Sequence, residues 1–518
     1  MNLSSLPLEK TNQFSNLFLD YIKEAQDLKA FYGRYPSLEN FKGQLQEKQF
    51  DPSKREVLVS SLKEQYKDFQ LSAVQNQSIE QLLLPETFTI TTGHQLSLAT
   101  GPLYFIYKIL TTIRLTEELT KAFPENNFVP VFWMATEDHD IAEINHFYLF
   151  GKKYEWETSE KGPSGKISTA NLKELFEKVP DCPAWLSDAY CNSKSLVEAT
   201  RKVAQYLFGT YGLIVIDGDD KNLKKQFTTV IENDLLENKY APIAKQTSEE
   251  LQNAGYKAQA FVRNENFFYL GDQTRERIEK QDGNYKVLNS DISFDNDSLQ
   301  NEIGDFPERF SPNVILRPLY QEMILPNLAY IGGPGELAYW LQLKGIFESE
   351  NIPFPILFPR KFATIIGKAT LDKVKSANLD LADLFLHEKD FFELLIEKLQ
   401  VEKLEFNEEE NLLLQIKNSL LQKATKADKS FFPAIEAEVS KINKGLEDLG
   451  KRLNKALENK HETELNKLQN LKRKLFPNNE LQERSDNFLN FYINNPDFIS
   501  AIHKDLDPFE FKMECLMI

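Results

Sequence analysis

The chain has 518 residues and a formal net charge of −17. Because an extended contact with a phosphate backbone needs clustered Lys and Arg, this charge argues against nucleic acid as a partner. A hydrophobic fraction of 41% with 27% charged residues is typical of a globular protein, and the length predicts two or three domains.

The beginning of the chain, MNLSSLPLEKTNQF, has no basic segment followed by an apolar core, and no apolar run reaches bilayer length. The three cysteines form neither a CxxC pair nor a Cys/His cluster with zinc spacing. We therefore expect a cytoplasmic protein with no membrane contact and no structural zinc.

Residues 1–84 carry apolar side chains at helical spacing, which predicts a helical lead-in packed on the core. Strand signals follow at residues 88–92, 129–134 and 213–217, with helical patterns between them. Strands separated by helices form parallel sheets with right-handed crossovers. Residues 85–150 are thus predicted to be the first part of an α/β core.

Residues 151–312 are predicted to hold the remaining core strands together with α+β insertions. Short apolar pairs flank a turn residue at 147–150 with 154–156 and at 260–262 with 267–270, a pattern that predicts antiparallel hairpins.

The α/β pattern returns in residues 313–370, the predicted last part of the core. Its strand signals lie at 314–318, 328–331 and 356–358.

Residues 371–518 are predicted to be a helical coiled-coil and dimerisation domain. One apolar stripe steps alternately by four and three residues, as in a left-handed coiled coil: Ile435, Val439, Ile442, Leu446, Leu449 and Leu453. A second stripe, Leu413, Ile416 and Leu420, could pair with it as an antiparallel hairpin within one chain. Intramolecular packing and a dimer contact fit such stripes about equally, and the length of the helix favours a homodimer.

The first candidate motif is a strand that ends in glycine and leads to a helix. Glycines allow close backbone approach and two polar side chains follow, which suits a phosphate or carboxylate. A plain strand-to-helix turn that needs glycine for its geometry is the alternative. The residues interpreted as nucleotide-binding here are Gly93, His94, Gln95, Thr100, Gly101, Pro102 and Lys108.

The second motif follows a buried-looking strand directly with four ionisable residues, Glu137, Asp138, His139 and Asp140. Carboxylates beside an imidazole could serve general acid/base catalysis, bind an amine or ligate a divalent metal. They could also simply favour a helix N-terminus. We take these four as the candidate catalytic residues.

The third motif is again a strand, a glycine turn and a helix, with Gly332 and Gly333 added to the nucleotide set. Glu336 would lie at the helix start, as a cap or facing a ligand amine. Arg317 and Arg360 adjoin prolines after β runs and are candidate anion clamps, with surface salt bridges as the alternative. Two such turns in one sheet predict two walls of one cleft.

Several catalytic signatures are absent from the sequence. There is no GxxxxGK[ST] P-loop, no GxSxG elbow and no HExxH helix, and the acidic run at residues 217–220 lacks EF-hand spacing.

Over essentially its whole length the chain resembles the bacillithiol biosynthesis cysteine-adding enzyme family, also called cysteine ligases. The matching residues, in order, are Gly93, Gln95, Thr100, Gly101, Pro102, Tyr104, Lys108, Trp133, Glu137, Asp138, His139, Asp140, Glu143, Asn145, His146 and 332–336. His94 departs from the pattern, because many members have glutamine there.

The resemblance implies a Rossmann-type core related to class I aminoacyl-tRNA synthetases and nucleotidylyltransferases, followed by a coiled-coil dimerisation domain. It also implies the last step of bacillithiol biosynthesis, in which the carboxyl group of cysteine is joined to the amine of glucosaminyl-malate. Cysteine-activating synthetases select the thiol with zinc, and this chain offers no such ligand set. The expected substrate-binding residues are Tyr104, Trp133, Glu143, His146, Arg317, Glu336 and Arg360.

Amide formation from a free carboxylate requires activation, so ATP or another nucleotide is expected, and a magnesium requirement stays open. In this hypothesis Lys108 and Arg317 offset anionic charge, and His139 with Glu137 or Asp138 deprotonates or orients the amine. Two alternatives remain at this point. One is a metal-dependent hydrolase or nucleotidyltransferase that uses the 137–140 block. The other is a noncatalytic scaffold that captures partners through residues 405–476.

Overall fold

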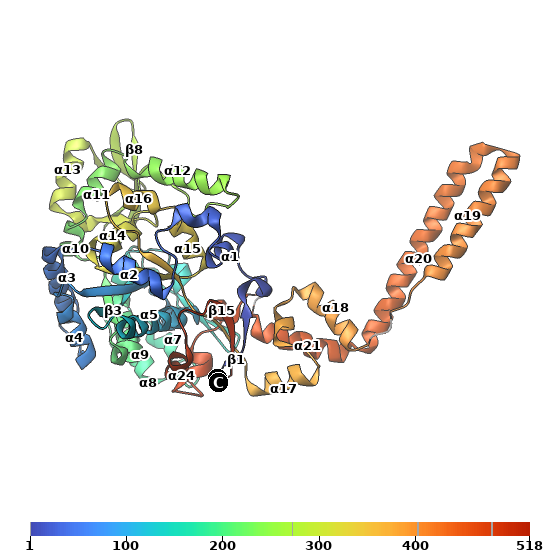
Figure 1. The fold of residues 1–518 in the computed structure, drawn as a ribbon, viewed down its shortest axis with the longest axis horizontal. Coiled ribbons are helices and arrows are strands. Elements are labelled where there is room, and N and C mark those ends of the chain that lie inside the picture. Colours follow the sequence, from blue (N-terminus) through green and yellow to red (C-terminus); the bar gives the residue numbers. More distant parts are fainter. Residues whose placement is uncertain (1, 272, 401–402, 478–479, 518) are drawn as a thin grey trace. The chain divides into compact units, whose positions relative to one another are not determined.

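The computed structural model describes residues 2–271, 273–400, 403–477 and 480–517, which divide into two units. The core unit is formed by Met1–Ile365 and Pro477–Ile518, and the helical unit by Ile366–Phe476 (Figure 1). The chain therefore leaves the core unit and later returns to it. None of the helices within these described stretches is long and apolar enough to span a bilayer.

The centre of the core unit is a five-stranded parallel sheet, which confirms the predicted α/β class. In sheet order its strands are β13 (Ile356–Pro359), β12 (Asn327–Gly332), β2 (Thr87–His94), β3 (Asn127–Met134) and β6 (Ile214–Asp217). After β2 the chain adds β3 and β6 on one side, and later β12 and β13 on the other. The strand order thus reverses between β2 and β12, where open parallel sheets form their binding crevice.

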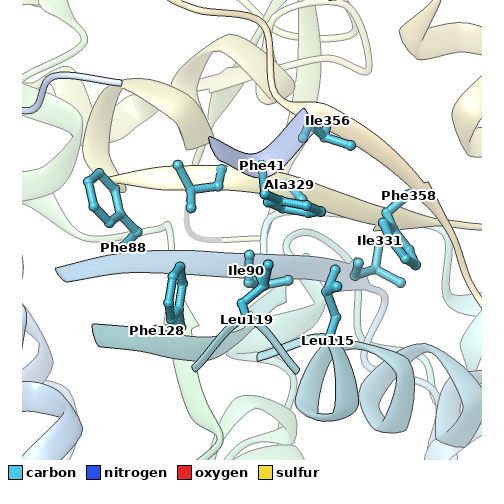
Figure 2. Close-up of a cluster of buried hydrophobic side chains, with 11 residues drawn as sticks. Phe41, Phe88, Ile90, Leu115, Leu119, Phe128, Ala329, Ile331, Ile356 and Phe358 are labelled. Carbon is cyan, nitrogen blue, oxygen red and sulfur yellow. The ribbon is translucent and has the colours of Figure 1, made fainter. Parts of the chain in front are cut away.

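Buried hydrophobic side chains hold this sheet against its helices (Figure 2). Leu115 and Leu119 of α5 (Tyr104–Ala122) and Phe41 of α2 (Leu38–Glu47) pack with strand residues such as Ile90 and Ile331. Burying one such side chain contributes about 1.5–3 kcal/mol. Every residue of β12 is buried, so both faces of the sheet are covered, which explains why these strands read as continuous apolar runs.

The first 84 residues contain four of the predicted lead-in helices but also a strand. The helices are α1 (Asn16–Ile22), α2, α3 (Pro52–Gln65) and α4 (Ala73–Gln81). The strand β1 (Asn2–Pro7) pairs antiparallel with β15 (Lys512–Leu516), which pairs parallel with β14 (Phe362–Ile365). The predicted helical coiled-coil domain at residues 371–518 thus ends in a strand, and its last part, from Pro477, belongs to the core unit.

Two long insertions interrupt the sheet. The first, between β3 and β6, comprises α6 (Ile141–Ile144), β4 (His146–Leu149), β5 (Lys152–Glu155), α7 (Lys173–Phe176), α8 (Ala184–Cys191) and α9 (Leu196–Phe208). The strands β4 and β5 pair antiparallel, which confirms the predicted hairpin.

The second insertion, between β6 and β12, contains helices and a five-stranded antiparallel sheet ordered β10-β9-β8-β7-β11. Its elements are α10 (Lys221–Lys225), α11 (Thr228–Leu235), α12 (Tyr240–Asn253), β7 (Phe267–Leu270), β8 (Arg275–Gln281), β9 (Asn284–Val287), β10 (Ser293–Phe294), α13 (Asn296–Asp305), β11 (Phe310–Pro312) and α14 (Arg317–Ile324).

Two strand predictions in this region are wrong. Residues 260–262 form no strand, because the buried Gln342 side chain binds both backbone polar groups of Ala260, and β7 pairs with β8 and β11 instead. The expected strand at 314–318 is a turn that leads into α14. Pro318 stands in the first turn of that helix, where its missing N–H costs no hydrogen bond.

The remaining elements complete the two units. After β12 the core unit has α15 (Pro334–Trp340) and α16 (Lys344–Ser349), and after its return it has α22 (Gln482–Ser485), α23 (Leu489–Tyr492), α24 (Phe498–Asp505) and β15. The helical unit consists of α17 (Lys368–Ser376), α18 (Glu388–Lys398), α19 (Asn407–Ala427), α20 (Phe432–Lys460) and α21 (Glu462–Leu475).

Within the helical unit, α19 and α20 lie side by side as an antiparallel hairpin (Figure 1). The two predicted stripes therefore lie on partner helices of one chain. The hairpin covers them only in part: Leu413 is buried, whereas Ile416 is 54% exposed and Ile442 is 51% exposed. His461 separates α20 from α21, at the place where the heptad spacing slips.

Candidate active site

A cleft of about 740 Å³ opens at the carboxyl edge of the central sheet, beside the reversal between β2 and β12. It unites the three sequence motifs, as the parallel register requires, because Thr92 pairs with Ile331 and Gly93 with Trp133. The predicted site residues that line it are Gly93, His94, Gln95, Tyr104, Lys108, Trp133, Glu137, Asp138, Glu143, Arg317, Gly333, Glu336 and Arg360. Those that do not line it are Thr100, Gly101, Pro102, His139, Asp140, His146 and Gly332.

His94 ends β2 with its ring packed against the rings of Tyr104 and Phe105, at centroid distances of 5.4 and 5.2 Å. Burial, with the nearby Lys108 ammonium, lowers the pKa of His94 to about 3, so the imidazole is neutral near pH 7. Its buried Nε2 has no hydrogen-bond partner in the part of the chain that the structure describes. His94 therefore contributes a neutral ring to the cleft lining, while its Nε2 atom lies inside the protein.

Gln95 connects the first motif to the second. Its Nε2 donates to Asp138 Oδ2 and to Glu143 Oε2, each at 2.7 Å. Burial opposes ionisation of Asp138, but the Gln95 hydrogen bond and the Arg275 guanidinium outweigh it and lower the pKa of Asp138. Asp138 is therefore a carboxylate near pH 7.

The buried Lys108 forms an ion pair with Glu336, whose side chain is 28% exposed in the cleft lining. The Lys108 ammonium binds both Glu336 oxygens, at 2.9 and 2.8 Å, and also the Gly93 carbonyl. Glu336 accepts further hydrogen bonds from the Tyr330 hydroxyl and from the Gly333 N–H, so it is both a helix cap and an ion-pair partner. Burial works against its charge, but Lys108 holds the pKa of Glu336 below its usual value. The charge of Lys108 is thus already balanced within the protein.

The acidic block divides into an inner and an outer part. Glu137 is 9% exposed and forms an ion pair with the buried Lys224, which also lies 3.2 Å from Asp219. His139 and Asp140 are exposed and lie outside the cleft lining. Only the first two residues of the block therefore face the cleft.

Arg275 of β8 stands behind the second residue of the block. Its side chain is 10% exposed, lies over the Phe268 ring at 3.9 Å and approaches Asp138 Oδ1 at 3.8 Å. Its Nη1 lies 3.1 Å from His139 Nδ1. Because arginine can only donate, that imidazole nitrogen is an acceptor and carries no proton.

A group of arginines also lines the cleft. Arg317 donates to the Tyr339 hydroxyl at 3.1 Å and has no carboxylate partner among the described residues. Arg360 is buried, binds Glu483 at 2.6 Å and lies over the Tyr104 ring, so it is not the surface salt bridge that was the alternative. Arg484 is exposed and also lines the cleft.

The predicted site residues that do not line the cleft make contacts within the fold instead. His146 begins β4, with its Nδ1 3.2 Å from Asn145 Oδ1 and its ring edge-on to Tyr148. Gly332 ends β12, where an added Cβ would come within 2.7 Å of Leu337. Thr100, Gly101 and Pro102 form the turn before α5 and shape the backbone there rather than the cleft surface.

Sequence reasoning missed four residues of the site. Lys224, Arg275 and Glu483 are partners of predicted site residues, and Arg484 lines the cleft. The acidic run at residues 217–220, which ends β6, was a usable signal for Lys224, because strand ends of one parallel sheet share an edge. No local pattern marks the other three.

The cleft lining thus has carboxylates at Glu137, Asp138 and Glu143, with Arg275 beside Asp138, and a group of arginines, Arg317, Arg360 and Arg484. Such a surface can bind a molecule that carries an amine together with anionic groups. Within the described ranges, no group of three or more His, Cys, Asp or Glu side chains is placed to hold a metal ion.

Comparison with known proteins gives a consistent answer. Residues 1–361 match the family described as bacillithiol biosynthesis BshC, N-terminal Rossmann-like domain, and residues 363–518 match its C-terminal coiled-coil domain. A Cytophaga hutchinsonii protein named "Putative cysteine ligase BshC" is 43% identical, covering 99% of this chain and 98% of its own.

Relatives with the same name extend to other bacteria. The Flavobacterium psychrophilum protein is 42% identical over 98% of both chains, and the Bacillus cytotoxicus protein is 29% identical over 94% of this chain and 95% of its own. The match covers both units at once, with the sheet and the helical hairpin in the order that the family descriptions give. The chain belongs to the bacillithiol biosynthesis BshC family.

Proposed function

We propose that this protein is a ligase that joins the carboxyl group of cysteine to the amine of glucosaminyl-malate, with nucleotide-dependent activation of the carboxylate. The name of the relatives supports a cysteine ligase, and the family description supports bacillithiol biosynthesis. The observation that carries the proposal is the cleft itself, which brings carboxylates and arginines together at the reversal of strand order.

The reaction needs an activated acyl group, because a carboxylate does not react with an amine at neutral pH. In the proposed first step a cysteine carboxylate oxygen bonds to a nucleotide phosphorus and displaces pyrophosphate or a nucleoside diphosphate. In the second step the amine of glucosaminyl-malate bonds to the acyl carbon, a proton leaves the nitrogen, and the nucleoside monophosphate or phosphate departs. The released nucleotide distinguishes the two activated intermediates.

The protein contributes groups suited to hold these reactants. The Gly93 and Gly333 backbone at the two strand ends, beside the neutral ring of His94, suits a nucleotide. Arg317, which lacks a carboxylate partner among the described residues, suits an anionic group of either substrate. Lys108 is a positioning residue in this proposal, since Glu336 already neutralises it.

Asp138 is the residue that we assign to the attacking amine. As a carboxylate of low pKa it binds and orients an ammonium group well, whereas it is a weak base. Gln95 and Arg275 fix its two oxygens, and Lys224 fixes the neighbouring Glu137. His139, with its Nδ1 facing Arg275, retains only Nε2 for a proton-transfer role.

We further infer that the protein is a homodimer assembled through α19 and α20. In support, Ile416, Ile442 and Leu449 are each about half exposed on the hairpin although they belong to the apolar stripes. A second hairpin that covered them would remove this apolar area from water.

The decisive experiment mixes purified protein with cysteine, glucosaminyl-malate, magnesium and ATP, and follows bacillithiol by mass spectrometry. Bacillithiol formation with stoichiometric AMP would support an acyl adenylate, and formation with ADP an acyl phosphate. Other nucleoside triphosphates and magnesium-free buffer are run in parallel.

Loss of bacillithiol in the host upon deletion of the gene, with accumulation of glucosaminyl-malate and rescue by wild type but not by Asp138→Ala, would support the same conclusion in cells. An unchanged thiol pool would contradict it. Activity proportional to a bound transition metal would favour the metal-dependent alternative, and ligand binding without turnover would favour the scaffold.

A further inference from the structure

The turn that precedes α5 has an unusual backbone. Ala99, Thr100 and Gly101 all have positive φ values, 47°, 70° and 65°. Two of the three are not glycine, and such residues stay in the left-handed region only when surrounding contacts hold them there. Ala99 and Thr100 are also buried, at 0% and 4% exposure, so their backbone polar groups need partners inside the protein.

Those partners include a residue that is distant in sequence. The buried Asn487 donates from Nδ2 to the Ala99 carbonyl at 2.7 Å and to the Gly101 carbonyl at 2.6 Å. Next to it, the Asp486 carbonyl accepts from the Leu103 N–H at 2.7 Å. On the other side of the turn, the Ala99 N–H donates to the Tyr190 hydroxyl at 2.9 Å.

Asn487 lies in the short segment that follows the helical unit. This return segment, residues 482–487, belongs to the core unit, and its Gln482 exchanges hydrogen bonds with the N–H and C=O of Ile365, the last core residue before the helical unit. Glu483 of the same segment holds Arg360 in the cleft wall. The return segment therefore contacts both the turn before α5 and the Arg360 side chain of the cleft lining.

We propose that Asn487 is a positioning residue of the active site. By binding both carbonyls that flank Thr100, it holds the left-handed turn, which connects Gln95 at the end of β2 to Tyr104 and Lys108 at the start of α5. All three of those side chains line the cleft. The inference rests on the proposed function for its catalytic part, but the geometry of the turn can be tested without the reaction.

The test compares two asparagines in the same segment. Asn487→Asp keeps the side-chain acceptor for the Leu489 N–H and removes both donors to the turn. Asn490→Asp is the matched control, because Asn490 Nδ2 also donates to two carbonyls, but those of Tyr148 and Asn487 rather than those of the turn. Backbone amide exchange of residues 96–107 is measured by mass spectrometry for both variants of the full chain, alongside their thermal unfolding.

We expect exchange in the 96–107 segment to rise at least tenfold in Asn487→Asp and to stay within twofold of wild type in Asn490→Asp. In the amide-forming assay, kcat/KM should fall 10- to 100-fold in Asn487→Asp, with KM for glucosaminyl-malate rising, because Gln95 holds Asp138. Asn487→Gln, which retains the amide donors on a longer side chain, should recover part of both losses.

Equal exchange of the turn in the two Asp variants would overturn the proposal, and so would faster exchange with wild-type kcat/KM. If Asn487→Asp does not fold, Asn487→Ala against Asn490→Ala carries the same comparison, because alanine removes the donors to the turn without adding a charge. If the wild type forms no amide product, the proposed function fails, and binding of ATP and ADP by calorimetry then decides whether the turn positions a ligand site.

Discussion

The cleft of the core unit and the hairpin of the helical unit use polar and apolar residues in opposite ways. Around the cleft, buried charges are matched in pairs, Lys108 with Glu336, Lys224 with Glu137 and Arg360 with Glu483. Along α19 and α20 the charged side chains are exposed to solvent. The apolar side chains of the two stripes are the ones left without full burial, because several are about half exposed. The charges around the cleft thus find their partners within the same chain, whereas the hairpin leaves an apolar surface that another molecule can cover.

Breaking one of the ion pairs around the cleft should have the largest effect on stability and activity. Lys108→Met leaves the partly buried Glu336 carboxylate without its cation, which is expected to destabilise the core unit by about 1–3 kcal/mol and to abolish activity. Thermal unfolding measures the loss. Lys441→Met, which removes the exposed pair with Glu438 on α20, serves as the control and should unfold like wild type. Equal losses in the two variants would remove the distinction between the two regions.

Removing the charge of a cleft carboxylate should abolish chemistry rather than folding. Asp138→Asn is expected to lower kcat/KM about 100-fold or more, because a neutral amide cannot bind an ammonium group as a carboxylate does. Its unfolding temperature should stay close to that of wild type, since the amide oxygen still accepts from Gln95. The exposed Asp140 provides the comparison, and an equal fall in Asp140→Asn would contradict the assignment to Asp138.

The buried imidazole of His94 predicts a pH dependence of stability. Its pKa is lowered to about 3, whereas an unfolded histidine titrates near 6.5. Between these values the unfolded chain binds a proton that the folded chain does not, so stability decreases as the pH falls from about 7. At pH 5 this contribution is about 2 kcal/mol, and His94→Gln should remove it.

Urea unfolding of wild type, His94→Gln and His139→Gln at pH 7.5 and pH 5 measures this contribution. The exposed His139 is the comparison, and a loss of acid sensitivity in His94→Gln alone would assign it to the buried imidazole. A His94→Gln variant as acid-sensitive as wild type would mean that His94 is protonated in the folded protein.

Substitutions in the hairpin should have the smallest effect on folding and the largest effect on assembly. Ile442→Lys places a charge on the half-exposed stripe and should convert a dimer to a monomer in sedimentation velocity, with little change in the unfolding of the core unit. Asn443→Lys adds the same charge at the adjacent position of α20 and should remain dimeric. A wild-type monomer at micromolar concentration, or equal behaviour of the two variants, would remove the dimer from the proposed function.

The sequence anticipated the parts of the site that follow from local pattern. The ends of β2, β3 and β12 could be predicted because buried parallel strands read as apolar runs that stop at polar residues or glycine, and such ends share one edge. The turn at 314–316 was mistaken for a strand because a short apolar run does not distinguish a buried turn from a strand. The strand β15 was not predicted, because its sequence pattern does not stand out beside the helical patterns that precede it.

By itself, the sequence determined the α/β class, the positions of the strands whose ends frame the cleft, the apolar stripes of α19 and α20 and the family. Each of these depends on periodicity or spacing within a short stretch. Only the tertiary structure decided which charge faces which: Glu137 with Lys224, Arg360 with Glu483, and Asn487 with the Ala99–Gly101 turn. These partners are far apart in the chain and share no periodicity. Their pairing arises because packing removes them from water together, and a buried polar group is stable only next to its complement.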